Sequence, residues 1–281
     1  MLISGPGQTV VVLGAGGRLG HAAALAFERA GWRVVAVTRT GRSLAGLERA
    51  EFRAADAEDS SQLLAAVAGA DVIFNGLNVP YPEWRQRALP LARSVLEAAR
   101  ASGATQLFPA NLYNYGPRLP ERLTPEVAFE PGQVRKAGVR VEIERAFASA
   151  AVEDGVQTLM LRAGDFYGHG TGSWFDLVIA KDLERGRVCY PGPLDVEHAW
   201  AYLPDLAQAF VRLAERRREL PSYLSLGYEG HALTGEQLIA HVETAVGRTL
   251  RRSRFPWPLL KLGRAGGLLR RRGRPEPARP S

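Results

Sequence analysis

The sequence predicts an α/β fold with a doubly wound parallel sheet and a small C-terminal lobe. Two observations predict this fold class. An apolar, β-branched run near the N-terminus ends in closely spaced glycines, and short apolar runs then alternate with helical patterns up to about residue 160. Such alternation is typical of parallel strands joined by helices. The length of 281 residues suits one large domain with a small appendage.

The first apolar run, Val10–Leu13, leads directly into glycines at positions 14, 17 and 20, and a helical pattern follows over residues 18–30. In a strand–turn–helix unit, Gly14 permits a sharp turn, Gly17 permits close approach of a diphosphate, and Gly20 permits close packing of the helix. The helix N-terminus offers free N–H groups to phosphates. The turn residues expected to contact a dinucleotide are Gly14, Gly16, Gly17, Arg18, Leu19 and Gly20.

The second strand is expected over residues 32–38, and its end bears on cofactor choice. An acidic residue there would bind the ribose 2′-hydroxyl of NAD, whereas a basic residue nearby would bind the 2′-phosphate of NADP. Thr38 ends the strand, and Arg39 and Arg42 follow. Arg18, in the glycine turn, is a further candidate for the 2′-phosphate. We therefore predict NADP rather than NAD, with solvated loop arginines as the alternative.

The remaining elements complete a dinucleotide-binding core over residues 1–160. Further strands are expected over 51–56, 71–76, 105–110 and 157–162, and helices over 60–68, 83–101 and 134–154. Ligands of such sheets bind beyond the carboxyl ends of the strands. The long irregular segment 111–132 contains four prolines, and segments of this kind are usually functional.

The C-terminal half is expected to divide between the core and a substrate lobe. A strand and a helix from about 188–217 are expected to return to the core, whereas 161–187 and 218–262 form the lobe. Within it we predict a glycine-rich loop over 164–173 and helices over 174–186 and 234–246, the last opened by a capping box. Residues 259–269 suggest a short amphipathic helix, and residues 263–281 are expected to be a disordered basic tail.

Composition narrows the function classes. The single cysteine, Cys189, excludes an internal disulfide and fits a reducing compartment. The sequence contains neither a signal-peptide pattern nor a run of about 20 apolar residues, so we expect a cytoplasmic protein.

The net charge of +7 comes from the tail, since residues 248–281 hold eleven of the 36 Lys and Arg and one of the 29 acidic residues. The rest of the chain is slightly acidic. Neither nucleic acid nor membrane is therefore expected as a partner. The sequence also lacks metal-ligand spacing and a GxSxG motif, so we predict neither a metal site nor a hydrolase.

From about residue 10 to 210 the sequence resembles the extended short-chain dehydrogenase/reductase superfamily, in particular its NAD-dependent epimerase/dehydratase group. The resemblance rests on the glycine turn, Ala55-Asp56, the run 63–74, Tyr115-Gly116, the run 161–168 and the run 202–207. It implies a Rossmann-type fold and a small-molecule substrate. It also implies a homodimer through the helices at 83–101 and 134–154.

The resemblance assigns further residues to the cofactor and the substrate. Asp56, with Ala57 beside it, would meet the adenine, and Asn75, Gly76 and Leu77 would line the dinucleotide. The substrate-lobe candidates are Asp165, Tyr167 and His169, and His198 is weighed with them as either a lobe residue or a structural one.

The expected catalytic group departs from the superfamily pattern of Ser or Thr, then Tyr, then Lys four residues later. Asn111 stands at the Ser position, four residues before Tyr115, and the helix over 134–154 has no Tyr-x-x-x-Lys. The register set by Glu144 places Lys136 at the Tyr position and Arg140 at the Lys position. A second register keeps Lys136 as the Lys but places Gly132 at the Tyr position.

The substituted residues suggest their own chemistry. Lys136 and Arg140 share one helix face, and the like charge favours proton release from Lys136, which makes it a candidate proton carrier. Arg140 would then contact the cofactor ribose or a substrate anion, and Asn111 would donate to a substrate oxygen. Tyr113 or Tyr115 is the alternative proton donor. A solvated basic stripe remains a third interpretation.

Two functions follow from this pattern. The first is an NADP-dependent oxidoreductase or epimerase/dehydratase-like enzyme acting on a small carbonyl, alcohol or sugar-type substrate. The second is a non-catalytic NADP-binding regulator or redox sensor, which the departures at the catalytic positions favour. A nucleic-acid binder that uses the arginine-rich tail is a weaker third hypothesis.

Overall fold

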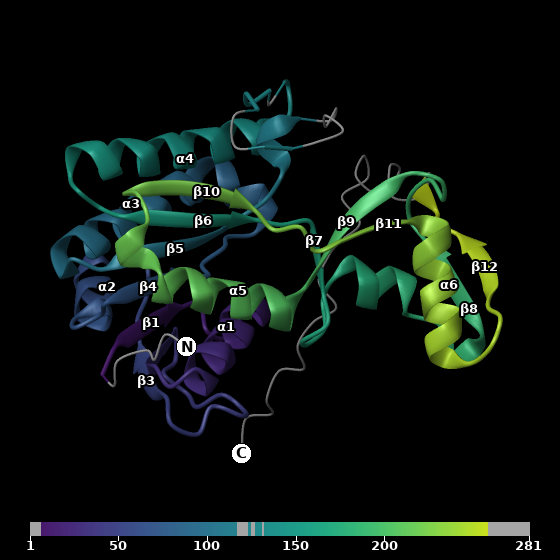
Figure 1. Cartoon of the computed structure of the whole chain (residues 1–281), viewed down its shortest axis with the longest axis horizontal. Helices are drawn as coiled ribbons and strands as arrows, with labels where there is room; N and C mark the ends of the chain where they lie inside the picture. Colours follow the sequence, from purple (N-terminus) through teal and green to yellow (C-terminus); the bar gives the residue numbers. More distant parts are fainter. Residues whose placement is uncertain (1–6, 117–122, 125–126, 131, 258–281) are drawn as a thin grey trace, which may run out of the picture.

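The computed structural model describes residues 7–116, 123–124, 127–130 and 132–257. The suggested helix at 259–269 and the tail at 263–281 lie outside the described residues. The molecule has two parts, a large parallel sheet covered by helices on both faces and a smaller lobe at one end (Figure 1). None of the described helices is long and apolar enough to cross a bilayer.

The large sheet has seven parallel strands in the order β10-β6-β5-β4-β1-β2-β3. The strand order reverses between β1 and β4, which is where dinucleotides bind in doubly wound sheets. The predicted Rossmann-type fold is thus confirmed. The strands are β1 (Thr9–Leu13), β2 (Arg33–Thr38), β3 (Glu51–Ala54), β4 (Val72–Asn75), β5 (Thr105–Ala110), β6 (Thr158–Arg162) and β10 (Tyr223–Gly227).

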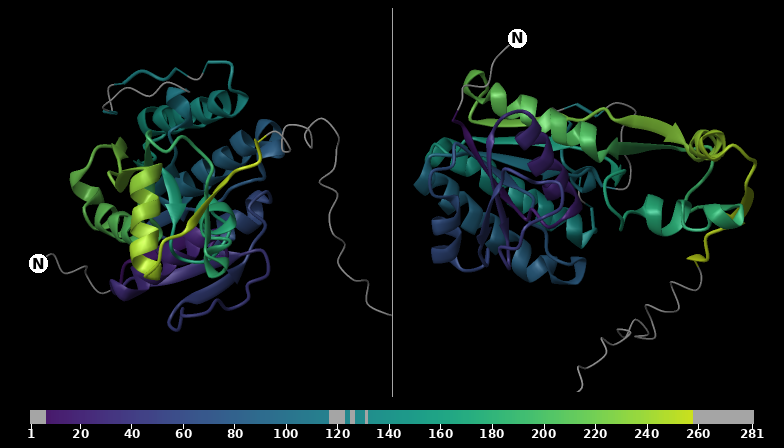
Figure 2. Two further views of the ribbon diagram at one scale, coloured as in Figure 1. Left: turned by 90° about the vertical axis from the view of Figure 1, so that its right-hand side faces the viewer. Right: turned by 90° about the horizontal axis from the view of Figure 1, so that it is seen from below.

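Helices cover both faces of this sheet, as Figure 2 shows edge-on. The period-two alternation of β1 explains why both faces are apolar, since Val10 and Val12 enter one core while Val11 and Leu13 enter the other. One face carries α1 (Arg18–Arg29) and α5 (Leu203–Glu215); the other carries α2 (Ser60–Val67), α3 (Trp84–Ser102) and α4 (Arg135–Glu153).

The smaller lobe has its own core around Ile179, Val188, Trp200 and Ile239. Its three-stranded sheet has the order β11-β9-β7, and β8 pairs with β12. The predicted capping box is confirmed, because the Gln237 N–H donates to the Thr234 hydroxyl oxygen and the Thr234 N–H donates to Gln237 Oε1. The lobe elements are β7 (Asp165–Tyr167), β8 (Arg187–Tyr190), β9 (Glu197–Tyr202), β11 (His231–Thr234), α6 (Gly235–Val246) and β12 (Arg251–Arg254).

Three expectations about the C-terminal half differ from the structure. Residues 223–227 were expected in the lobe but form β10, which covers the free edge of β6; an uncovered edge strand would leave backbone groups unpaired. From 188–217 the helix α5 returns to the core as expected, but the strand β9 stays in the lobe sheet. Residues 174–186 do not form one helix but a π-helical turn, Phe175–Ile179, and a 3-10 turn, Leu183–Arg185.

Candidate functional site

The glycine turn after β1 is shaped by backbone crowding. Gly14 has φ of +73°, and a Cβ there would lie 2.8 Å from the Gly76 carbonyl oxygen. A Cβ on Gly20 would lie well inside 3 Å of the Gly14 carbonyl oxygen. The expected roles of Gly14 in a sharp turn and of Gly20 in close helix packing are therefore confirmed.

The start of α1 is suited to an anion. Gly17 is the N-cap residue and provides no side-chain cap, and the first turn contains no acidic residue. The N–H groups of Arg18, Leu19 and Gly20 follow this cap and have no acceptor within the helix. Gly16 is exposed, and a Cβ there would meet only the Thr38 methyl, at 3.7 Å. This open, uncapped turn at the sheet's reversal point fits a dinucleotide diphosphate.

Arg18 does not take the expected position near a ribose phosphate. Its Nε donates to the His169 carbonyl oxygen at 3.0 Å, and its Nη2 donates to the Gly168 carbonyl oxygen at 3.2 Å. The same Nη2 lies 3.6 Å from the Asp176 carboxylate. These contacts direct the Arg18 side chain to the lobe, and its binding to the 2′-phosphate stays a prediction.

The end of β2 provides other cations. The Thr38 hydroxyl accepts from the Gly41 N–H at 3.0 Å, which fixes a tight turn. Arg39 and Arg42 lie in and just after this turn, and neither is buried. At the end of β3, Asp56 is exposed and its Oδ1 accepts from the Glu58 N–H. The chain thus places two accessible guanidinium groups close to the strand end where an adenosine ribose is expected.

A buried chain of amides fixes the end of β4. Asn75 is 3% exposed and donates to Gln106 at 3.1 Å, and Gln106 in turn donates to Thr158. This series of hydrogen bonds crosses β4, β5 and β6. The Leu77 N–H points to Asn75 Oδ1 at 3.4 Å, so the same side chain also orients the loop expected to line the dinucleotide. Gly76 donates to the Leu13 carbonyl oxygen and brings this loop against β1.

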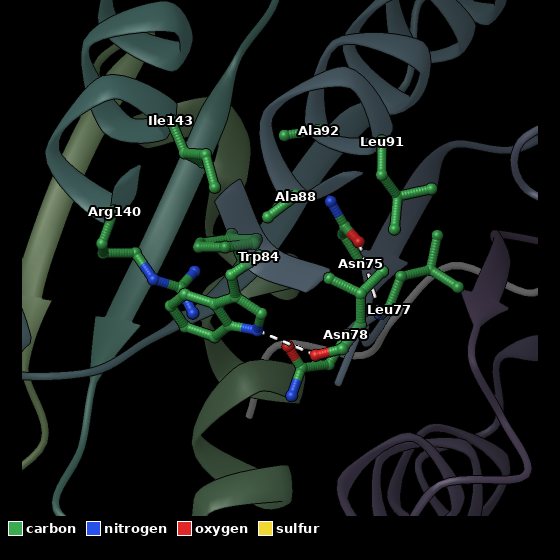
Figure 3. A pocket seen from close by; sticks show the side chains of 11 residues that line it. Asn75, Leu77, Asn78, Trp84, Ala88, Leu91, Ala92, Arg140 and Ile143 are labelled. Atoms are coloured by element: carbon green, nitrogen blue, oxygen red, sulfur yellow. Dashed lines mark hydrogen bonds between the residues drawn. The ribbon is translucent and has the colours of Figure 1, made fainter. Parts of the chain in front are cut away.

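Arg140 lies in a small pocket beside this loop (Figure 3). Its guanidinium carbon is 4.9 Å from the Trp84 ring centre and 5.1 Å from that of Phe108. Trp84 is buried and donates from Nε1 to the Val79 carbonyl oxygen at 2.8 Å. Cation–π contacts of this kind orient a guanidinium. Arg140 therefore lines one pocket with the loop after Asn75, oriented by aromatic neighbours that the sequence did not indicate.

Lys136 and Tyr113 come together from different elements. The Lys136 ammonium lies 5.3 Å from the centre of the Tyr113 ring. Tyr113 begins a 3-10 turn after β5, and its N–H donates to Asn111 Oδ1 at 3.1 Å. The Trp84 ring is 6.4 Å from that of Tyr113. Three of the five predicted catalytic residues, Tyr113, Lys136 and Arg140, therefore lie around Trp84, and Asn111 adjoins Tyr113.

Tyr115, the fifth candidate, belongs to a buried structural cluster. It is 5% exposed, and the Arg162 guanidinium carbon lies 5.4 Å from its ring centre. Burial raises the pKa of its phenol. Arg162 makes a bidentate ion pair with Glu144, and both side chains are almost fully buried. The Tyr115 ring therefore packs against a buried ion pair, which favours a structural role over proton donation to a substrate.

Glu144 points into the core, and Arg140, four residues earlier, lies on the same side of α4. The register that places Lys136 and Arg140 at the Tyr and Lys positions stays a prediction.

The three substrate-lobe candidates have different surroundings. Asp165 pairs with His198 at 3.0 Å, with both side chains nearly half exposed. Tyr167 stacks among lobe aromatics, including Tyr202 at 5.3 Å. His169 lies against α1 instead, with its Nε2 2.7 Å from the Nδ1 of His21. The His169 ring therefore connects the lobe to the core, and its assignment to the substrate stays a prediction.

The contacts of Trp84 and His21 could not be predicted from the sequence. Trp84 is a single tryptophan at a helix start, and His21 is an ordinary helix residue by pattern. Their roles depend on partners far along the chain. Within the part of the chain that the structure describes, no group of three or more His, Cys, Asp or Glu residues is arranged to hold a metal ion.

Comparisons with known proteins agree with this fold. The model of the NAD dependent epimerase/dehydratase family matches residues 10–227. No curated protein sequence matches the chain significantly.

Similar solved structures include a UDP-glucose 4-epimerase from Brucella ovis in complex with NAD, with a TM-score of 0.74 and 16% identity over 88% of this chain and 85% of that one. A UDP-N-acetylglucosamine 4-epimerase from Bacillus cereus has a TM-score of 0.74 and 14% identity over the same shares. A putative epimerase from Burkholderia cenocepacia has a TM-score of 0.73 and 18% identity over 92% and 86%. At these identities the likeness shows the fold.

Proposed function

Because the chain belongs to the NAD-dependent epimerase/dehydratase family, we propose that it is an NADP-dependent oxidoreductase or epimerase/dehydratase-like enzyme acting on a sugar-type substrate. The observation that carries the proposal is the uncapped start of α1 after a turn that only glycine can form. The sugar-type substrate is inferred from the family and from the nucleotide-sugar enzymes that share the fold.

The preference for NADP is supported by the end of β2. Thr38 stands where a carboxylate would select NAD, and the accessible Arg39 and Arg42 follow it. Asp56 would meet the adenine, and the turn from Gly14 to Gly20 would bind the diphosphate. The bound cofactor would supply hydride transfer. The chain itself orients the cofactor and handles one proton.

We assign the proton transfer to Lys136. Its side chain is exposed, so substrate can reach it, and the Tyr113 ring orients its ammonium by a cation–π contact. In reduction, Lys136 would donate a proton from Nζ to the substrate oxygen; in oxidation, the neutral amine would accept it. Asn111 uses its Oδ1 for the Tyr113 N–H, which leaves its Nδ2 to donate to the same oxygen. The Tyr113 phenol is the alternative proton carrier.

Lys136→Met tests this assignment. We expect turnover of NADPH with a panel of carbonyl sugars to fall at least 100-fold, because general acid–base catalysis contributes roughly 10²–10⁴-fold. The dissociation constant for NADPH should remain within threefold of wild type. Lys181→Met, at an exposed lysine in the lobe, is the matched control and should retain activity.

Tyr113→Phe separates the two proton carriers. It keeps the ring beside Lys136 but removes the hydroxyl. Turnover close to wild type supports Lys136, whereas a loss equal to that of Lys136→Met would assign the proton to the phenol.

A non-catalytic NADP-binding regulator is the second candidate. The observations that favour it are the Lys and Arg at the positions of the usual Tyr and Lys, and the burial of Tyr115. Tight NADPH binding without turnover across the sugar panel would support this function over the enzyme.

The homodimer implied by the resemblance would use α3 and α4. These helices pack side by side, and a surface groove runs along them, lined by Leu89, Arg93, Leu96 and Ala146 among others. Light scattering on the purified chain checks the mass, and Ala146→Arg should convert a dimer to a monomer.

A further inference from the structure

The smaller lobe contains a pocket with aromatic walls that the mechanism above does not use. Three tryptophans and a tyrosine make up half of its lining residues, and a carboxylate and an imidazole lie with them. Its lining residues are Asp165, Trp174, Tyr190, Pro191, Gly192, His198, Trp200 and Trp257.

The strand register builds one wall of this pocket. Asp165 on β7 pairs with Trp200 on β9. His198 is two residues before Trp200, so both side chains lie on the same face of the strand. Their rings are 4.9 Å apart, and His198 reaches the Asp165 carboxylate at 3.0 Å. The polar pair and the indole therefore occupy fixed positions beside one another.

The opposite wall comes from more distant segments. Trp257, which follows β12, donates from Nε1 to the Pro191 carbonyl oxygen at 2.9 Å. Its ring is 6.4 Å from that of Trp174. Trp174 and Trp257 remain 44% and 46% exposed. Large aromatic faces that stay this open are available to a ligand.

The charges around this pocket do not suit an anion. Among the described lining residues the charged or titratable groups are Asp165, His198 and the Tyr190 phenol, with no lysine or arginine. Arg162, just before β7, pairs with Glu144, and Arg18 lies near Asp176. A diphosphate entering the pocket would meet a carboxylate without a lining guanidinium to offset it, which selects against it.

An adjoining groove does contain arginines. It shares Tyr190, Pro191, Gly192 and Trp257 with the pocket and is lined by Arg252 and Arg254 as well. Arg252 pairs with Glu236. Arg254 in the groove attracts a diphosphate, whereas Asp165 in the pocket repels it. The experiment must therefore compare the affinities of sugars with and without a diphosphate.

We propose that this pocket binds the ring of an uncharged sugar in preference to a sugar that carries a nucleoside diphosphate. Indole faces pack against the apolar C–H face of a pyranose, while the carboxylate accepts and the imidazole exchanges hydrogen bonds with ring hydroxyls. This inference rests on the proposed function for the class of substrate, and it distinguishes the chain from the UDP-sugar enzymes that share its fold.

Titration of the full chain tests the proposal, with tryptophan fluorescence and calorimetry as readouts. The probes are methyl glycosides of glucose, galactose and mannose, and UDP-glucose and UDP. At least one methyl glycoside should bind saturably, and UDP-glucose should bind no more tightly than that glycoside. The proposal is overturned if no glycoside binds, or if UDP or UDP-glucose binds more tightly than every glycoside.

Each titration is run with and without NADPH, so that the proposed function and the pocket proposal are tested independently. Absence of NADPH binding contradicts the proposed function. The order of the sugar affinities, measured with or without NADPH, tests only the pocket.

Asp165→Asn assigns the binding to this pocket. We expect the glycoside affinity to fall about tenfold, because hydrogen bonds to charged groups are among the stronger ones, and the affinity for UDP-glucose to rise or stay constant. Glu197→Gln removes an exposed carboxylate from the neighbouring strand β9, outside the pocket, and should change neither value. If Asp165→Asn binds the glycoside as tightly as wild type and has an unchanged circular dichroism spectrum, the assignment of the glycoside to this pocket is overturned.

Discussion

Single residues decide whether the first turn of the fold can form, and Gly20 is the clearest case. Gly20→Ala would place a methyl group against the Gly14 carbonyl oxygen. Overpacking of this kind costs about 1–3 kcal/mol, so we expect a matching loss in the free energy of unfolding by urea. NADPH affinity should fall as well, since α1 must shift.

Gly138→Ala is the matched control, because a methyl group on this glycine of α4 would meet no atom within 4 Å. It should stabilise the chain by roughly 0.5–1 kcal/mol, the difference between Ala and Gly in a helix. Equal stability losses in the two variants would contradict the packing role of Gly20.

The buried ion pair between Arg162 and Glu144 gives a second prediction at this scale. Glu144→Gln leaves the Arg162 charge without its partner, and breaking a buried pair in this way typically costs about 3–5 kcal/mol. Denaturant unfolding measures the loss. Glu142→Gln, at an exposed position of the same helix, should change stability by less than about 0.5 kcal/mol. A Glu144→Gln variant as stable as this control would refute the structural role.

The glycine turn was predictable from sequence because its roles depend on spacing within a few residues. The outcomes for Arg18 and Tyr115 were not predictable in this way. Arg18 bonds to carbonyl groups about 150 residues later, and Tyr115 packs beneath an ion pair formed by a different helix and strand. Local pattern indicates which residues bear charge or a phenol, but long-range packing decides where they point.

At the scale of elements, α1 and the loop after β7 are joined through His21 and His169. The two rings are stacked, with centres 4.9 Å apart, and His21 Nε2 also lies 2.8 Å from the Ala45 carbonyl oxygen. Burial, followed by the charges of His21, Arg18 and Arg29, lowers the pKa of His169. Protonation of His169 would therefore weaken this connection.

The free energy of unfolding should consequently decrease as the pH falls below the ordinary pKa of histidine, about 6.5. The unfolded chain binds a proton at His169 as pH falls through about 6.5, whereas the folded chain resists it until lower pH. The contribution is complete above about 6.5 and is lost on acidification. His169→Gln should flatten the dependence of the unfolding free energy between about pH 7 and 5. An identical slope in this variant and wild type would contradict the connection.

The alternation of strands and helices predicted the core well, because each element there has a strong apolar pattern. The lobe was harder to predict. Its strands β7, β8 and β12 are three or four residues long and mostly not buried, so they carry little pattern. β10 is likewise short and has no buried residue, yet it joins the large sheet, since the open edge of β6 provides its partner.

The molecule as a whole combines a Rossmann-type fold with an aromatic pocket in its smaller lobe. The resemblance covered the glycine turn and the strand order, whereas the grouping of Lys136, Tyr113 and Trp84 became visible only in the structure. Chain topology is fixed by many residues together, whereas chemistry depends on a few. The fold could therefore be predicted from the sequence, whereas the identity of the catalytic residues could not.

Binding of reduced dinucleotide to the purified chain is the measurement on which the whole interpretation depends. Calorimetric titration should give a micromolar dissociation constant for NADPH and at least tenfold weaker binding of NADH. The double variant Arg39→Ala/Arg42→Ala should bring the two constants within threefold of each other. A chain that binds neither dinucleotide would contradict the role of the glycine turn and, with it, the proposed function.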